Sequence, residues 1–200
     1  MSCQAALRWD TIKVFEGPHR EARKLHAGPL ALPICLLVFK LRSATGPDAE
    51  AIIRIHFAAV HETASPYYPP DVVSAWSKPP CEDRYERVRQ SIAKGDEMFV
   101  VAERESVIVG FGSIVPREHE LRSVYVHPDL GRRGVGAMIL ERLERMAMEQ
   151  RVVTLELDGS INAEAFYRRH GYVVIEHCVR PIGGTHTMAC VRMRKVLTSV

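Results

Sequence analysis

The sequence predicts a mixed α/β domain (an α+β mixed sheet), with helices packed on both faces of one sheet. The order of the elements predicts this class, and length and composition predict a single globular domain. Strand-like and helix-like segments follow the order strand, two helices, three strands, helix, strand, helix, two strands. The chain has 200 residues, of which 46% are hydrophobic and 26% charged, so it is long enough for one globular domain with a sizeable core.

The first part of the chain predicts one strand and one helix after a stretch without a clear period. Residues 34–42 are apolar and partly β-branched, which indicates a strand. A helix begins at Pro47 and Asp48, both typical of helix starts. The spacing of Ile52 and Ile55 predicts that this helix packs by one face.

A proline-rich loop with a short helix at residues 72–77 leads to a second amphipathic helix. That helix covers the segment 81–95 and has Gly95 past its end. Three candidate strands follow, the first two joined by a hairpin turn. These strands cover residues 98–103, 107–115 and 120–127.

The stretch YVHPDLGRRGVGAMILERLERM passes from a strand into a helix through two glycines, Gly134 and Gly136. Glycine is costly there unless the backbone must bend or something must come close. The free N–H groups of a helix start favour an anion, and Arg132 and Arg133 add charge. The stretch therefore predicts a phosphate cradle, although it is neither a P-loop nor the dinucleotide fingerprint. A glycine loop entering a surface helix is the alternative.

The last third of the chain predicts a strand, a short helix and two closing strands. The strand is residues 152–157, and the helix in SINAEAFYRRHGY ends at Gly171. The closing strands, residues 172–178 and 187–196, are separated by a PIGGT turn.

Charge and cysteine content limit the classes of function. The net charge of +3 permits an anionic cofactor but does not argue for a nucleic-acid partner. The five cysteines are far apart and lack zinc spacing, so we expect reduced thiols in a cytoplasmic protein and no metal site. The longest apolar run, residues 30–39, is too short to span a bilayer and contains Pro33, and we identify no signal peptide or membrane partner.

Four segments in the same order and spacing resemble the GNAT superfamily of acyl-CoA-dependent N-acyltransferases: LRSATGPDAEAI, VGFGSI, VYVHPDLGRRGVGAMIL and SINAEAFYRRHGY. The resemblance covers roughly residues 37–197, and YYPPDVVSAW is similar to a bacterial branch of small, mostly uncharacterised acetyltransferases. It implies a central, mostly antiparallel sheet that splays between its fourth and fifth strands. We expect a GNAT domain over residues 34–200 and an N-terminal extension of unknown role over residues 1–33.

The resemblance implies that acetyl-CoA is bound by the glycine loop, as the acyl-donor substrate. The family motif is Gln/Arg-x-x-Gly-x-Gly/Ala, and backbone amides in it hold the pyrophosphate of coenzyme A. Gly131 occupies the Gln/Arg position, which is a departure that the neighbouring arginines are expected to offset. The cradle implied by the motif consists of Arg132, Arg133, Gly134, Val135, Gly136 and Ala137.

The same resemblance implies further contacts with the cofactor. Backbone groups of Val124 and Val126 are expected to pair with the pantetheine arm, and the Val124 N–H to polarise the thioester carbonyl. Family members often carry an asparagine seven residues before the conserved tyrosine. Ser160 stands at that position and Asn162 lies two residues later, so either side chain is a candidate for cofactor contact.

Two residues are candidates for the proton transfers. Glu120 matches the glutamate base of the histone-acetylating branch; its alternatives are an exposed structural glutamate, or Glu156 or His119 as the base. Tyr167 matches the tyrosine of the family's Phe-Tyr-x-x-x-Gly-Phe/Tyr motif and is the candidate acid for the leaving thiolate. Its alternative is an aromatic packing residue.

The acceptor is not readable from the sequence. In the family the first two helices and their loop shape the acceptor side, so His61, Tyr67, Tyr68 and Trp76 are candidates for its lining, with loop packing as the alternative. We expect an N-acetyltransferase that moves an acetyl group to a primary amine of a small molecule or peptide by direct attack in a ternary complex. A non-catalytic acyl-CoA-binding module and, more weakly, a nucleotide-binding protein are alternatives, and a homodimer is left open.

Overall fold

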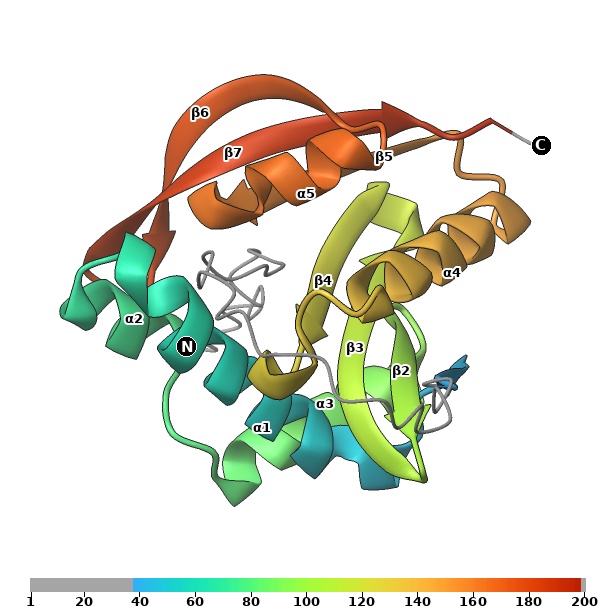
Figure 1. Cartoon of the computed structure of the whole chain (residues 1–200), viewed down its shortest axis with the longest axis horizontal. Helices are drawn as coiled ribbons and strands as arrows, with labels where there is room; N and C mark the ends of the chain where they lie inside the picture. The colour runs from blue at the N-terminus through green and yellow to red at the C-terminus, as the bar shows by residue number, and fades with distance from the viewer. Residues whose placement is uncertain (1–37, 199–200) are drawn as a thin grey trace, which may run out of the picture.

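The computed structural model describes residues 38–198 and contains a seven-stranded sheet with helices on both faces (Figure 1). The strands are β1 (Lys40–Ser43), β2 (Met98–Arg104), β3 (Val107–Val115), β4 (Glu120–Val126), β5 (Thr154–Ser160), β6 (Val173–Ile182) and β7 (His186–Val196). They lie in the order β1-β2-β3-β4-β5-β7-β6, and neighbours are antiparallel except for the parallel pair β4 and β5. The predicted mixed α/β class is confirmed.

Five α-helices accompany the strands in the described part of the chain. They are α1 (Ala49–Ala58), α2 (Pro70–Trp76), α3 (Glu82–Lys94), α4 (Val135–Glu149) and α5 (Glu164–Arg169). Two hydrophobic clusters place them on opposite faces of the sheet. One cluster contains Ile139 of α4 and Phe166 of α5, and the other contains Ile52, Val72 and Val88 of α1, α2 and α3.

Glycines in β3 allow α4 to lie unusually close to the sheet. A Cβ atom at Gly112 would lie only 2.7 Å from side-chain atoms of Ile139 and of Leu143. Both of these side chains are fully buried, so they have little room to move. The apolar face of α4 therefore packs directly onto the backbone of β3.

Several predicted boundaries were wrong, although the order of elements was confirmed. The predicted strand 34–42 is β1, which begins at Lys40; residues 34–37 lie outside the described part. The first helix continues through a π-helical segment, Ala59–Ala64, which ends at the first residue of the predicted proline-rich loop. The strand predicted at 152–157 is β5, which extends to Ser160.

The C-terminal elements also differ from prediction in their ends. The predicted short helix is a 3-10 turn, Ile161–Ala163, followed by α5. Strand β6 includes Pro181 and Ile182, so only the last three residues of PIGGT form the turn before β7. The predicted extension over residues 1–33 lies outside the described residues.

Strands β4 and β5 separate almost as soon as they meet, which confirms the predicted splay. Their only ladder pair in the described sheet is Glu120 with Glu156, beside a hydrogen bond of 2.9 Å from the Glu156 N–H to the His119 carbonyl. Beyond that point β5 stays paired with β7 as far as Ser160, while β4 stays paired with β3 (Figure 1). The sheet therefore opens between its two halves.

Two further findings concern membrane-spanning segments and cysteines. Within residues 38–198, no helix is both long and apolar enough to cross a membrane. The described cysteines, Cys81, Cys178 and Cys190, are free thiols. The sulfur atoms of Cys178 and Cys190 face each other across β6 and β7 at 2.8 Å.

Candidate active site

The edge of β4 that faces the opening carries backbone groups directed away from β3. The His127 N–H donates to the Val109 carbonyl at 2.8 Å, which makes Val126 and Gly110 a non-hydrogen-bonded pair of the β3–β4 ladder. Because orientation alternates along an antiparallel strand, the N–H and C=O of Val126 and Val124 point toward the opening. The side chains of both valines are buried in the cluster beneath α4.

The N-terminus of α4 lies beside the same opening and presents main-chain donors. Gly134 precedes the helix with a φ of 80°, a left-handed conformation that glycine adopts without strain. The first helical hydrogen bond is from the Met138 N–H to the Gly134 carbonyl, so the N–H groups of Val135, Gly136 and Ala137 have no acceptor within the helix.

A side chain at either glycine of this turn would not clash with the surrounding protein atoms. A Cβ atom at Gly134 would meet nothing within 4 Å, and one at Gly136 would contact the Phe166 ring at an ordinary 3.5 Å. Arg132 and Arg133 are exposed just before the turn. The arrangement is a shallow surface of amide donors flanked by positive charge, which suits a phosphate group.

Helix α5 brings the candidate acid, Tyr167, to the far side of the opening. Its ring is fully buried and packs 3.5 Å from the position of a Cβ at Gly159 of β5. Its hydroxyl has no hydrogen-bond partner within residues 38–198, and burial raises the pKa of the phenol well above its usual range. Tyr167 is therefore a protonated donor at neutral pH.

The turn before α5 holds the two candidates for cofactor contact. Ser160 is buried at the end of β5. Both polar atoms of the Asn162 amide are buried, and neither has a hydrogen-bond partner in the part of the chain that the structure describes. Buried amides are normally satisfied, so Asn162 and Tyr167 both fit a site that receives a polar ligand.

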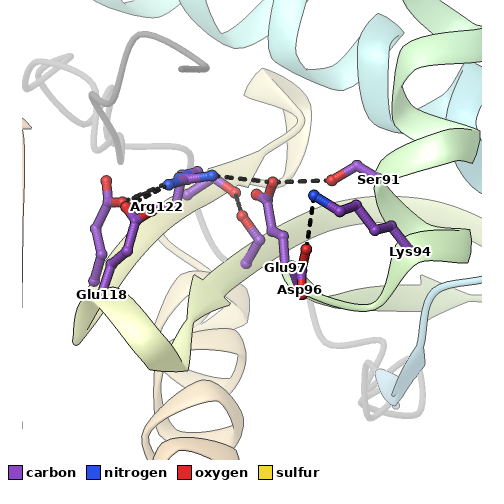
Figure 2. A network of polar contacts seen from close by, with 9 residues as sticks. Ser91, Lys94, Asp96, Glu97, Glu118 and Arg122 are labelled. Atoms are coloured by element: carbon purple, nitrogen blue, oxygen red, sulfur yellow. Dashed lines mark hydrogen bonds and ion pairs between the residues drawn. The ribbon is translucent and has the colours of Figure 1, made fainter. Parts of the chain in front are cut away.

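Glu120, the candidate base, begins β4 where the strands part, and it is bound by an arginine. Arg122 donates from Nη2 at 2.7 Å and from Nε at 3.1 Å to Glu120 Oε2. Arg122 also faces Glu118 at 3.1 Å and Glu97 at 3.5 Å (Figure 2). Glu97 in turn accepts a hydrogen bond from the Ser91 hydroxyl at 3.2 Å.

Sequence reasoning missed Arg122 and Glu97. Arg122 had a detectable signal, because residues two apart on a strand share a face and Glu120 was already a candidate. Glu97 had none, because it reaches the site from the loop between α3 and β2.

The two alternatives for the base lie in different surroundings. Glu156 accepts hydrogen bonds from Arg192 at 2.8 Å and from Arg194 at 2.9 Å, and the Arg192 hydrogen bond lowers the pKa of Glu156 below its usual value. His119 is exposed in the turn before β4, with a φ of 54°.

The four candidates for the acceptor side differ in how far they are buried. Tyr68 and Trp76 are buried, with ring centroids 5.6 Å apart. Tyr67 is 41% exposed. His61 hydrogen-bonds the Ser77 carbonyl at 2.8 Å.

The Tyr68 hydroxyl connects the helical side of the molecule to the opening. It donates to the Ala189 carbonyl of β7 at 3.0 Å and accepts from the Ile161 N–H at 2.8 Å. Ile161 immediately precedes Asn162, so Tyr68 supports the turn that leads into α5.

A small cavity lies on the α1 side of β4. Its polar lining includes His56, Glu97, Arg122 and Ser123, and the rest is mostly apolar. Burial lowers the pKa of His56 to about 3, so this imidazole is neutral. Within the described residues no three histidine, cysteine, aspartate or glutamate side chains are grouped so that they could hold a metal ion.

Comparisons with known proteins identify the family. Residues 64–197 match the family model described as an acetyltransferase (GNAT) domain. The Escherichia coli (strain K12) protein YafP, an uncharacterised N-acetyltransferase, is 29% identical over 137 residues, 68% of this chain and 83% of its own.

Solved structures share the fold. A GCN5-related N-acetyltransferase from Rhodopseudomonas palustris is 26% identical with a TM-score of 0.70, covering 79% of this chain and 95% of its own. YncA from Salmonella typhimurium, determined with its cofactor acetyl-CoA, is 20% identical with a TM-score of 0.62, covering 82% of this chain and 96% of its own. The chain belongs to the GNAT acetyltransferase family, and it is an acetyltransferase enzyme.

Proposed function

We propose that this enzyme moves an acetyl group from acetyl-CoA to a primary amine of a small molecule or a peptide, by direct attack in a ternary complex. The observation that carries the proposal is the opening between β4 and β5, which has amide donors at one end and the buried Tyr167 hydroxyl at the other. This arrangement suits a thioester arm, whose phosphates would meet the amide donors while its reacting end meets a proton donor.

The residues around the opening fit acetyl-CoA as the donor. The amides of Val135, Gly136 and Ala137 would hold the pyrophosphate, together with the charges of Arg132 and Arg133. The outward-facing backbone of Val124 and Val126 would pair with the amide groups of the pantetheine arm. The unpartnered Asn162 amide and Ser160 would contact the cofactor near the start of α5. The acetyl-CoA bound to YncA supports the same donor.

Three groups of the chain would perform the chemistry. When bound, acetyl-CoA supplies an activated acyl group as a thioester. The Val124 N–H would donate to the carbonyl oxygen as negative charge develops there. Glu120 would accept the proton of the amine, directly or through one water. Tyr167 would donate its phenolic proton toward the departing sulfur.

The acceptor would approach from the side of α1 and α2. Tyr67 and His61 are the candidates nearest to solvent, whereas Tyr68 and Trp76 would act by shaping the wall. The free thiols and the modest net charge support a cytoplasmic enzyme that uses neither nucleic acid nor membrane. Size-exclusion chromatography with light scattering distinguishes a monomer from the homodimer that the sequence left open.

A thermal-shift screen followed by a turnover assay tests the proposal. At one hundred times its Kd, acetyl-CoA is expected to stabilise the protein by about 2.7 kcal/mol, or roughly 5–10 °C. Release of free thiol is then measured with a panel of amines. Gly136→Val should abolish the shift by filling the cradle, whereas Gly46→Val, at a glycine with open space around it, should not.

Two results would contradict the proposal. An unchanged shift in Gly136→Val would exclude the cradle. Stabilisation by acetyl-CoA without thiol release for any amine would favour a non-catalytic acyl-CoA-binding protein.

A further inference from the structure

A β-bulge interrupts β4 at Arg122, two residues after the candidate base. Ser113 pairs with Ser123 and Ile114 with Leu121, so Arg122 has no partner residue on β3. A bulge of this kind re-aims a side chain, and Arg122 and Ser123 consequently both line the cavity on the α1 side of β4. The distortion lies at the start of β4, where β4 leaves β5.

The arginine is mostly buried among three carboxylates. Its side chain is 13% exposed, and those of Glu97, Glu118 and Glu120 are 6%, 52% and 19% exposed. Figure 2 shows Arg122 between Glu118 and Glu97, with Ser91 holding Glu97 from α3. Burying a cation here is costly, so the contacts with the carboxylates must offset the desolvation.

The three contacts are not equivalent. Two donors of Arg122 converge on one oxygen of Glu120, whereas the contact with Glu97 is long, at 3.5 Å. A guanidinium that donates twice to one carboxylate restricts both its rotation and its position. Glu120 is therefore the carboxylate that Arg122 orients most strongly.

The surplus of carboxylates suits a base that gains and loses a proton. In an isolated ion pair, protonating the acid would leave a buried guanidinium uncompensated, which is strongly unfavourable. Here Glu97 and Glu118 still face Arg122 after Glu120 takes a proton from the amine. The proton can then pass to solvent, and the starting charge distribution returns.

We propose that Arg122 is a positioning residue, which orients the Glu120 carboxylate and keeps it ionised where the acceptor amine arrives. This inference rests on the proposed function, because it assumes that Glu120 is the base. Arg122 acts through Glu120 and does not itself touch the reacting atoms.

Other titratable groups lie near this pair. His119 adjoins Glu120 in the preceding turn, and Glu156 of β5 is opposite it, bound to Arg192 and Arg194. His56 and Tyr125 line the cavity beside Arg122, where burial keeps both neutral. Arg122 hydrogen-bonds Glu120 in the geometry given above.

The test measures kcat and kcat/KM against pH in Arg122→Gln, Glu97→Gln and the wild type. Without the positive charge, Glu120 holds its proton more tightly, so Arg122→Gln should move the acid limb of kcat/KM up by about one pH unit. Its kcat should fall at least tenfold. Glu97→Gln removes a negative charge and should move the same limb down. A residue that only supports the fold would not produce opposite shifts.

Two further variants complete the design. Arg122→Lys keeps the positive charge but loses the planar guanidinium that donates twice to Glu120. The acid limb of kcat/KM should therefore stay near that of the wild type, while kcat falls. Arg117→Gln is the matched control, because Arg117 is 87% exposed in the turn before β4. It should leave both kcat and the acid limb unchanged.

The thermal shift with acetyl-CoA shows that each variant is folded and binds the donor. The inference is overturned if Arg122→Gln has the pH profile and kcat of Arg117→Gln, or if it loses kcat without moving the acid limb. It is also overturned if Glu120→Gln keeps the wild-type limb. The proposed function fails separately, when the wild-type enzyme turns over no amine.

Discussion

Tyr167 is the residue whose environment most directly favours a chemical role. The hydroxyl is buried without a partner in the described chain, which is unfavourable for a residue that only packs. Tyr167→Phe should therefore lower kcat by roughly a hundredfold, while the Kd for acetyl-CoA and the melting temperature stay nearly unchanged. Steady-state kinetics, calorimetric titration and thermal unfolding measure the three quantities. A parallel loss of kcat and of affinity would contradict the assignment as acid.

His56 makes stability depend on pH. Its folded pKa is about 3, because of burial first and the nearby Arg84 charge second, whereas its unfolded value is 6.5. Below pH 6.5 the unfolded state binds more protons, so stability is present above that pH and is lost as the pH falls toward the folded pKa. Between pH 7 and pH 5 we expect a loss of about 2 kcal/mol.

Urea unfolding at several pH values measures this loss. The His56 Nδ1 lies 2.9 Å from the Ser77 hydroxyl, and His56→Asn keeps an acceptor there without a titrating ring, so its stability should depend less on pH. His119→Asn is the control: His119 is exposed and left-handed, a conformation that asparagine tolerates, and it should keep the wild-type slope. Equal slopes in the wild type and His56→Asn would exclude His56 as the cause.

At the scale of elements, the contact of α4 with β3 is set by backbone proximity. Gly112→Ala would place a methyl group 2.5 Å from the Ser123 carbonyl oxygen and against two buried side chains, so it should destabilise the fold by about 1–3 kcal/mol. Gly46→Ala, with open space around it, should change stability little. Urea denaturation compares the two variants. Similar midpoints would mean that α4 can move away from the sheet at low cost.

Hydrophobic periodicity in the sequence identified the helices and strands, but it did not identify element ends that depend on tertiary contacts. The end of β5 illustrates the limit. Asp158, Gly159 and Ser160 are poor strand formers, and they are held in the strand by pairing with β7. The π-helical end of α1 had no signal either, because it depends on packing of Val60 and Ala64 in the cluster on that face.

The candidate site likewise contains some residues that local sequence motifs predict and some contacts that only the folded chain creates. The glycine turn and Tyr167 lie in short sequence motifs, so both could be named as candidates from the sequence alone. The role of the Tyr68 hydroxyl could not be predicted, because its partners are 93 and 121 residues away. The Arg122–Glu97 contact likewise joins residues 25 positions apart, and only the folded sheet brings them together.

At the scale of the whole fold, the sheet of residues 38–198 consists of two halves that meet at one ladder pair between β4 and β5. Each face of the sheet is closed by its own hydrophobic cluster within residues 38–198. The site lies where the halves separate, so its geometry depends on both clusters. The Tyr68 bridge from the α1–α2 side to β7 joins the halves a second time, beyond the opening.

The domain boundary expected near residue 34 leads to a final prediction. A chain beginning at residue 34 should keep the melting temperature within about 2 °C and the kcat/KM within twofold, because β1 and both clusters are retained. Limited proteolysis of the full chain should remove the extension first and leave an active fragment. A fall of tenfold or more in kcat/KM, with acetyl-CoA affinity preserved, would instead assign residues 1–33 to the acceptor side of the site. Protection of these residues from protease, together with a lower melting temperature after truncation, would make them part of the domain.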